Sequence, residues 1–211
     1  MNITNEDKIK GYIYSNQISM FGNKEIIGYG VNDFYVKEIE RDLANKTIIK
    51  NHYSKKVYNG TYINLGVFIK DEMLGVLQYG YAMNPASCES VVEGTEMNQY
   101  LELNRMWLDD KAIRNSESKA ISYSIKYIKG KIKTIKWISF WELDGETFHN
   151  SIKTSEKAGK RGFRLLNDPK NKDRVTHHTL RQFRYIKFLD SRWVKKCNHK
   201  EKPYLKHYNN D

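Results

Sequence analysis

The stretch "INLGVFIKDEMLGVLQYGYAM" (residues 63–83) contains two apolar runs that are rich in β-branched and aromatic residues. The polar residues Lys70, Asp71 and Glu72 separate the two runs, and such a break between strand-forming runs predicts a β-hairpin. Because a hairpin joins antiparallel strands, the sheet that contains it must be at least partly antiparallel.

The segments on both sides of this hairpin alternate between strand and helix patterns. Period-two and helical spacings predict strands at 33–39, 99–110, 134–141 and 183–189, and helices ending near 53, spanning 116–129 and spanning 149–163. Residues 84–98 are expected to form a polar loop, and strict alternation places Leu103, Arg105 and Trp107 on one side of their strand. The fold class is therefore α/β, more narrowly α+β, with a mixed, partly antiparallel central sheet flanked by helices.

The length of 211 residues suits one compact domain. We divide the chain into an N-terminal extension (1–32) holding one or two short strands, a main domain (33–190) and a basic C-terminal tail (191–211) that packs on or beside it. The two cysteines are far apart without a CxxC pair, which argues against a disulfide framework and a cysteine zinc site. The polar start and the lack of a long apolar run favour a cytoplasmic protein with no membrane association.

The net charge of +11 is unevenly distributed. Residues 153–207 hold 17 Lys and Arg against 5 Asp and Glu, whereas the remainder holds 19 against 20. Localised cations of this kind favour a surface that binds a polyanion such as DNA, because they release counterions from phosphates. A solvated basic tail without a partner is the alternative.

The motif "LNRMWLDDKAIRNSES" (103–118) predicts a strand, a short polar loop and a helix start. A helix start presents unpaired N–H groups and the positive end of the helix dipole, which suit a phosphate-bearing ligand. Asn115, Ser116 and Ser118 are the candidate phosphate-binding residues, although a purely structural N-cap explains the same residues.

Two charged residues lie on predicted strands. Arg105 is mid-strand, where it either pairs with a core carboxylate or faces a cleft and an anionic ligand. Glu142 follows the run "KWISFW" at the end of a strand, where it would act as a general base, ligate a metal, or remain a solvated strand-end acid.

The stretch "NHYSKK" (51–56) places His52 and Tyr53 side by side near a predicted helix end. Neighbours on a helix diverge by about 100 degrees, so both side chains can face one site only if the helix ends there and the chain turns. The alternative is a surface histidine beside a core-packing tyrosine.

Taken in order, these pieces resemble the phage Mom family of DNA-modification proteins, whose fold is similar to that of GNAT acyltransferases. The resemblance extends from about Val36 to Lys206 and is carried by "HYSKK", "LGVF", "LGVLQYG", "ELNRMWLDD", "RNSES", "ISFWE", "SEKAGKRGF", "HTLRQFRYIKFLD" and "KPYLK". It implies transfer of a carbamoylmethyl or related group to the exocyclic N6 of adenine in phage DNA, which shields that DNA from host restriction enzymes.

By this resemblance, His52, Tyr53 and Glu142 are the catalytic residues, and Arg105 with the loop 116–118 belongs to the acyl-CoA region. The family usually has an aspartate where Glu142 stands, and a family tyrosine has no clear counterpart, since Lys153 or Ser155 stands near its place. The implied donor is acetyl-CoA or another acyl donor. A carbamoylmethyl group is bonded through its α-carbon, so simple acyl transfer does not complete it, and iron with His52 and Glu142 as candidate ligands is one implied solution.

The implied partner is double-stranded DNA, and a homodimer is a further expectation. An N6 amine is inaccessible inside a stacked duplex, so the base must be flipped or the duplex opened. The candidate phosphate contacts are Lys55, Lys56, Arg184, Lys195 and Lys196. Tyr185, Trp193 and Tyr204 are candidates for stacking on bases or for core packing. Two other functions remain open: an ordinary GNAT N-acetyltransferase acting on a protein or small amine, and a basic DNA-binding protein without catalysis.

Overall fold

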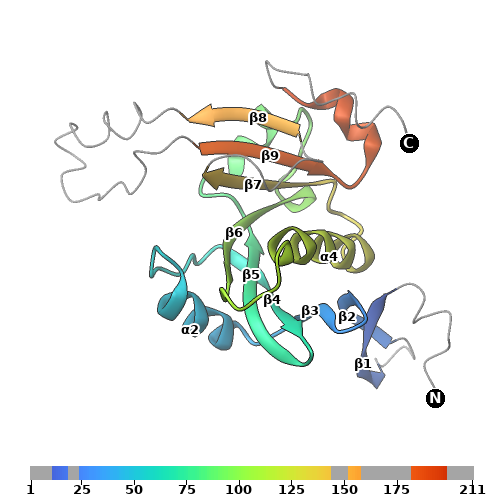
Figure 1. Ribbon diagram of the computed structural model, residues 1–211. Helices are drawn as coiled ribbons and strands as arrows, with labels where there is room; N and C mark the ends of the chain where they lie inside the picture. Colours follow the sequence, from blue (N-terminus) through green and yellow to red (C-terminus); the bar gives the residue numbers. More distant parts are fainter. Residues whose placement is uncertain (1–10, 19–23, 144–151, 158–181, 199–211) are drawn as a thin grey trace.

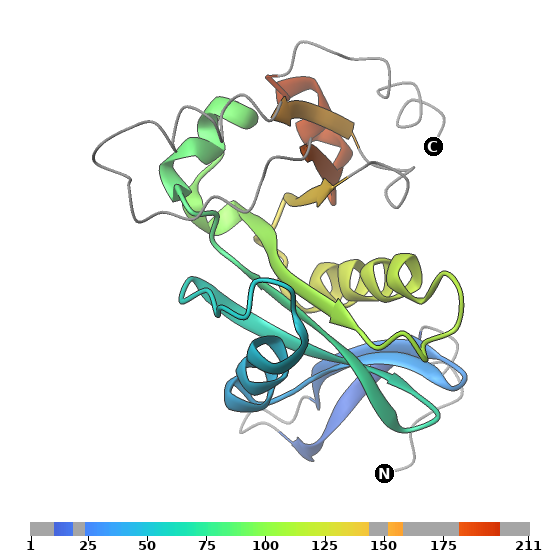
Figure 2. The ribbon, with the colours of Figure 1, turned by 60° about the vertical axis from the view of Figure 1, so that its left-hand side comes forward.

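The computed structural model describes residues 11–18, 24–143, 152–157 and 182–198 (Figures 1 and 2). The longer elements are β1 (Tyr12–Ile18), β2 (Lys24–Val31), β3 (Phe34–Glu38), α2 (Arg41–Asn51), β4 (Thr61–Ile69), β5 (Glu72–Gly80), β6 (Tyr100–Leu108), α4 (Ser116–Lys131), β7 (Trp137–Leu143), β8 (Ile152–Lys157) and β9 (Gln182–Phe188). The short helices are η1 (Pro85–Ser87), α3 (Cys88–Val91), η2 (Met97–Gln99) and η4 (Ser191–Lys196).

Within these ranges, the strands form one nine-stranded sheet in the order β1-β2-β3-β4-β5-β6-β7-β9-β8. Every neighbouring pair is antiparallel except β6 and β7, which are parallel. The mixed, partly antiparallel sheet that the sequence predicts is therefore confirmed.

The predicted hairpin is β4 and β5. Its two-residue turn consists of Lys70 and Asp71, with positive φ angles of 50° and 67°, a backbone that matches the twist of the strands it joins. The hydroxyl of Tyr35 on β3 donates to Asp71 Oδ1 at 2.8 Å, which fixes the turn to the next strand.

The two long helices cover opposite faces of the sheet (Figure 2). Ala120, Ile121 and Ile128 of α4 join the largest hydrophobic cluster, which also contains Leu77 of β5. Ala44 and Ile48 of α2 pack on Val76, the preceding residue of β5. Because neighbouring residues of a strand point to opposite faces, this arrangement separates an α2 face from an α4 face. The predicted helix ending near residue 53 and the predicted helix 116–129 are confirmed as α2 and α4.

Two segments differ from the sequence-based predictions. The structure describes residues 152–157 of the predicted helix 149–163. The helix prediction is wrong for them, because Ile152–Lys157 is strand β8, paired antiparallel with β9. Helical spacing was misleading here because pairing with a distant strand overrides local preference. The predicted loop 84–98 contains η1, α3 and η2. The one or two short strands expected within residues 1–32 are confirmed, because β1 and β2 are strands of the common sheet.

Strands β6 and β7 separate after a short paired section. Tyr100, Leu101 and Glu102 pair with Trp137, Ile138 and Ser139, and no pairing continues beyond them. We call this point the β6/β7 fork. A second hydrophobic cluster, which includes Tyr100, Trp137 and Phe188, lies at the paired end. The fork therefore opens away from a well-packed base.

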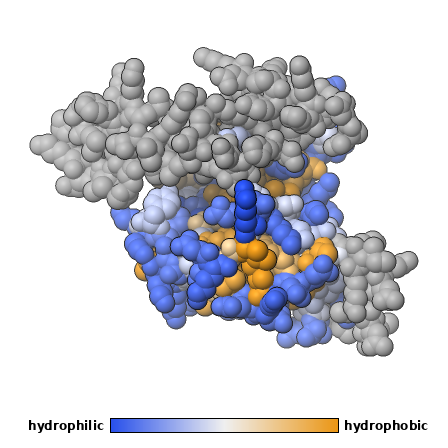
Figure 3. Space-filling view, in the orientation of Figure 1, coloured by the Kyte–Doolittle hydropathy of each residue, from blue (hydrophilic) through white to orange (hydrophobic). Residues whose placement is uncertain are grey.

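Hydrophilic residues cover most of the described surface seen in Figure 3, with a smaller hydrophobic area in its middle. Of the helices in the described ranges, none combines the length and the apolar composition that crossing a bilayer requires.

Candidate functional site

The structure ends α2 directly before the His52-Tyr53 pair. His52 caps the helix by donating its backbone N–H to Ile48 O at 2.9 Å, and the chain then turns through Lys55, whose φ is 50°. The His52 side chain is only 6% exposed and the Tyr53 side chain is 67% exposed, so the alternative of a surface histidine beside a core tyrosine is wrong. Their ring centroids are 4.2 Å apart.

The hydrogen bonds of His52 define the protonation of its ring. Ser54 donates its backbone N–H to His52 Nδ1 at 3.1 Å, and the Ser54 hydroxyl lies 2.9 Å from the same nitrogen. Since Nδ1 accepts a hydrogen bond, the neutral ring carries its proton on Nε2. Burial, reinforced by the positive charges of Arg105 and Lys55, lowers the pKa of His52 from 6.5 to about 4. At neutral pH His52 is therefore an uncharged Nε2–H donor.

Arg105 supports the loop that carries His52. Its Nε donates to Lys56 O at 3.0 Å and its Nη1 donates to Asn104 O at 2.7 Å. The guanidinium is thus satisfied in part by backbone carbonyls, and no carboxylate in the described ranges forms an ion pair with it. The structure brings together His52, Tyr53, Lys55, Lys56 and Arg105 at the end of α2.

A β-bulge in β6 explains why Arg105 faces this loop. The register between β5 and β6 shifts by one residue between the pairs Gln78–Arg105 and Tyr79–Leu103. Leu103 packs in the α4-face cluster, whereas Trp107 packs in the α2-face cluster. The predicted common side for Leu103, Arg105 and Trp107 is therefore wrong, because the extra residue reverses the alternation.

Glu102 is a further candidate site residue, which the sequence did not single out. Its side chain is 7% exposed at the β6/β7 fork, and Ser139 Oγ donates to its Oε2 at 3.1 Å. Tyr58, whose hydroxyl donates to Ala82 O at 2.9 Å, lies close enough for the charge of Glu102 to add to burial in raising the Tyr58 pKa. A buried carboxylate is costly unless it is paired or hydrogen-bonded. The available signal was an acid between two leucines in "YLELN".

The start of α4 differs from an ordinary capped helix. Asn115 occupies the N-cap position with φ 68° and ψ 11°, and its side chain accepts no hydrogen bond from the first turn. Ser116 is buried and Ser118 is exposed. Asn115 is the N-cap residue, as predicted, but its side chain does not cap the helix by a hydrogen bond. Arg105 lies on the α2 face of the sheet, so the structure does not group it with Asn115, Ser116 and Ser118 beside α4.

The remaining candidates lie in β7 and in the segment after β9. Glu142 in β7 pairs with Phe183 of β9, next to the pair of Trp141 and Arg184. Lys195 and Lys196 are in η4, and the Lys196 Nζ lies 4.4 Å from the Trp193 ring centroid.

Of the three candidates for stacking on bases, Tyr185 is buried in the main core and is unavailable for that role. Trp193 packs partly buried against the second hydrophobic cluster. Tyr204, like Lys206 at the end of the resemblance, falls outside the described residues.

The residues around His52 do not assemble a metal site in the ranges that the structure describes. No three His, Cys, Asp or Glu side chains there converge as ligands. In addition, the hydrogen bond from Ser54 to Nδ1 keeps the proton on Nε2, the nitrogen that would otherwise ligate a metal. The described contacts of His52 therefore do not fit the iron site that the resemblance implied.

Comparisons with known proteins agree with this architecture. The chain matches the model of the Mom protein family over residues 33–141 and 139–206. It is 38% identical over 205 residues to the methylcarbamoylase Mom of Escherichia phage Mu, covering 83% of this chain and 84% of that protein.

Solved acetyltransferase structures share the fold at low sequence identity. The NAA60 protein of Arabidopsis thaliana, solved with acetyl-CoA, superposes with a TM-score of 0.50 at 8% identity, covering 72% of this chain and 98% of that one. The ribosomal-protein-S5-alanine acetyltransferase of Vibrio fischeri has a TM-score of 0.49 at 11% identity, covering 79% of this chain and 98% of that one. The fold is that of the GNAT acetyltransferases, and the chain belongs to the Mom protein family.

Proposed function

We propose that this protein is a transferase that adds a carbamoylmethyl or related group to the exocyclic N6 of adenine in phage DNA. Two findings support the chemistry: membership of the Mom family and 38% identity to a methylcarbamoylase over most of both chains. The observation that carries the location of the site is the buried, uncharged His52, which lies beside Arg105 at the end of α2.

His52 acts as a hydrogen-bond donor in this proposal. A group with a pKa of about 4 is a weak base at neutral pH, and its Nδ1 is already occupied by Ser54. Its Nε2–H is suited to hold an acceptor oxygen of the transferred group, as uncharged imidazole does in other enzymes that polarise a carbonyl. Arg105 keeps the loop in place through Lys56 O.

Tyr53 and Glu142 complete the catalytic set. Tyr53 is exposed and rests against the His52 ring, which suits an aromatic side chain that stacks on an adenine extruded from the duplex. The Glu142 carboxylate would accept the proton that leaves the N6 amine. This division of roles separates the group that donates a hydrogen bond from the group that accepts a proton.

The donor is acetyl-CoA or a related acyl carrier. The start of α4 supports a phosphate-binding role for Asn115, Ser116 and Ser118, because Asn115 leaves the first-turn N–H groups without a side-chain cap. In this proposal the donor reaches the α2 face through the β6/β7 fork, beyond the pair Glu102–Ser139. The chemical identity of the donor must also account for a bond at the α-carbon.

DNA is held through its phosphates by Lys55, Lys56, Arg184, Lys195 and Lys196 in this proposal. The enzyme would act on double-stranded phage DNA in the cytoplasm of the host, alone or as a homodimer, and protect that DNA from restriction.

Reversing the charges of Lys195 and Lys196 should weaken DNA binding equally across sequences, because phosphate contacts carry no sequence information. Unchanged affinity would remove these residues from the DNA surface.

A restriction assay tests the proposed function. Plasmid co-expressed with the protein should resist enzymes whose sites contain the modified adenine, and plasmid co-expressed with the His52→Ala variant should be cut. A cleavable plasmid with retained, salt-sensitive DNA binding would instead indicate a DNA-binding protein without catalysis. Acetyl transfer to proteins or amines without any DNA effect would indicate an ordinary acetyltransferase.

A further inference from the structure

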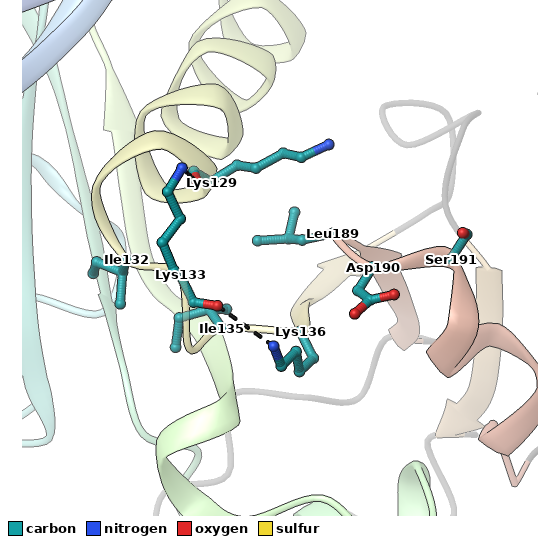
Figure 4. A pocket seen from close by; sticks show the side chains of 8 residues that line it. All are labelled: Lys129, Ile132, Lys133, Ile135, Lys136, Leu189, Asp190 and Ser191. Carbon is teal, nitrogen blue, oxygen red and sulfur yellow. Dashed lines mark hydrogen bonds between the residues drawn. The ribbon is translucent and has the colours of Figure 1, made fainter.

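A pocket of about 350 Å³ lies at the C-terminal end of α4, away from His52 (Figure 4). It is formed by two segments that are distant in the sequence: the end of α4 with its connection to β7, and the residues between β9 and η4. The lining residues are Lys129, Ile132, Lys133, Ile135, Lys136, Leu189, Asp190 and Ser191.

Backbone hydrogen bonds hold these two segments together. The N–H groups of Leu189 and Asp190 donate to Lys136 O at 2.8 and 3.3 Å. Ile135 and Leu189 contribute to the main hydrophobic cluster beneath the pocket. The lysines are therefore mounted on a fixed part of the fold.

The three lysines of the pocket have spare hydrogen-bonding capacity. Lys133 Nζ donates to Lys129 O at 3.1 Å and Lys136 Nζ donates to Lys133 O at 3.5 Å, which leaves two further protons on each ammonium. Within the described ranges none of the three forms an ion pair, whereas Lys131 bridges Glu25 and Glu38 on the neighbouring strands.

The one acid in the pocket is already neutralised. Asp190 accepts hydrogen bonds from Arg192 Nε at 2.9 Å and from Arg192 Nη2 at 2.7 Å. These bonds hold the pKa of its carboxyl below the ordinary value. Arg192 is therefore the main partner of Asp190, to which the charge of Lys136 contributes less, and the pocket keeps an excess of positive charge.

Cations at a helix C-terminus also interact with the helix dipole, which is the structural explanation for Lys129 and Lys133. That explanation does not apply to Lys136, which follows the helix by five residues. Lys195 and Lys196 are in the last turn of η4. Because η4 begins at Ser191 in the pocket wall and rises about 2 Å per residue, Lys195 lies about 8 Å along it from the pocket.

We propose that Lys129, Lys133 and Lys136, together with the adjoining cations of η4, bind the phosphate backbone of the DNA substrate. This inference rests on the proposed function, because it names the surface on which that substrate docks. Lys136 directly precedes β7 and stands three residues before Ser139, so the pocket lies about 10 Å from the β6/β7 fork at Glu102. A duplex held here would have its neighbouring bases within reach of the fork.

The test compares two double variants of the full chain that lose the same charge. Lys129→Gln/Lys136→Gln removes two pocket cations, and Lys46→Gln/Lys70→Gln removes two exposed cations from α2 and the hairpin turn. Each is titrated with a mixed-sequence DNA duplex at several salt concentrations. Thermal unfolding of each variant verifies that it remains folded.

The pocket variant should bind DNA more weakly, with the slope of log K against log salt reduced by about 2, since each phosphate contact contributes about 0.9 to that slope. The matched control should keep the wild-type slope. Equal slopes for the two variants would overturn the docking surface while leaving the proposed function intact. Absence of DNA binding by the wild type would overturn both.

Discussion

At the residue scale, the proposed activity depends on His52 being buried and uncharged. The sequence singled out His52 as a residue beside a helix end, and the structure adds that it is buried and that its Nδ1 accepts the Ser54 N–H. Local sequence could predict the position of His52 but not its burial, which depends on the turn after α2, where Arg105 of β6 donates to Lys56 O.

The first prediction concerns activity. His52→Ala should lower the rate of DNA modification by about 10²- to 10³-fold, the usual effect of removing one donor that stabilises developing charge. His52→Asn, which retains an N–H donor, should keep more activity than His52→Ala. Single-turnover modification of a duplex substrate measures both rates, and equal rates for the two variants would exclude a donor role.

The second prediction concerns pH. The pKa of His52 falls from 6.5 in the unfolded chain to about 4 in the fold, so the unfolded state binds a proton first. Above about pH 6.5 His52 is uncharged in both states and does not lower the stability of the fold. The free energy of unfolding should then decrease as pH falls from about 6.5 to 4. Urea unfolding across this range should show a steeper decrease for wild type than for His52→Gln. Parallel curves would mean that His52 is not buried as an uncharged ring.

The third prediction concerns Glu102, which alternation within the strand could not identify as a site residue. Glu102→Gln retains the shape and can still accept from Ser139, and thermal unfolding verifies that the variant remains folded. The modification rate should fall if the carboxylate serves the site. Ser139→Ala is the control for the hydrogen bond alone. An unchanged rate in Glu102→Gln would make the residue purely structural.

At the scale of elements, prediction succeeded where the information is local. The hairpin, α2 and α4 follow from turn residues and apolar spacing over a few residues, and all three are confirmed. The β6 bulge and strand β8 depend on partner strands, with Asn104 displaced opposite β5 and Ile152 paired with Ile186. A pattern within one segment does not contain that information.

The fourth prediction concerns the start of α4. Asn115 has a left-handed backbone and no capping hydrogen bond from its side chain. Asn115→Gly should therefore preserve the free energy of unfolding, whereas Asn115→Ala should lower it by about 1 kcal/mol, because a Cβ disfavours this conformation. Urea denaturation measures the difference. A larger loss in the glycine variant than in the alanine variant would show that the Asn115 side chain itself is required.

At the scale of the whole molecule, the sheet joins surfaces that the sequence shows separately. The excess positive charge was assigned to the last quarter of the chain, yet the run "KYIKGKIKTIK" (126–136) holds five lysines without an acid. The fold places the end of this run against Asp190 and Ser191, next to η4. Only the order of strands in the sheet, with β7 beside β9, could reveal this combined surface.

Mass spectrometry of deoxynucleosides tests the central claim most directly. DNA from cells that express the wild-type protein should contain a deoxyadenosine heavier by one carbamoylmethyl or closely related group on N6. DNA from cells that express equal amounts of His52→Ala or Glu142→Ala should contain only ordinary deoxyadenosine. The account would be contradicted by unmodified deoxyadenosine in the presence of folded wild-type protein, or by full modification in both variants.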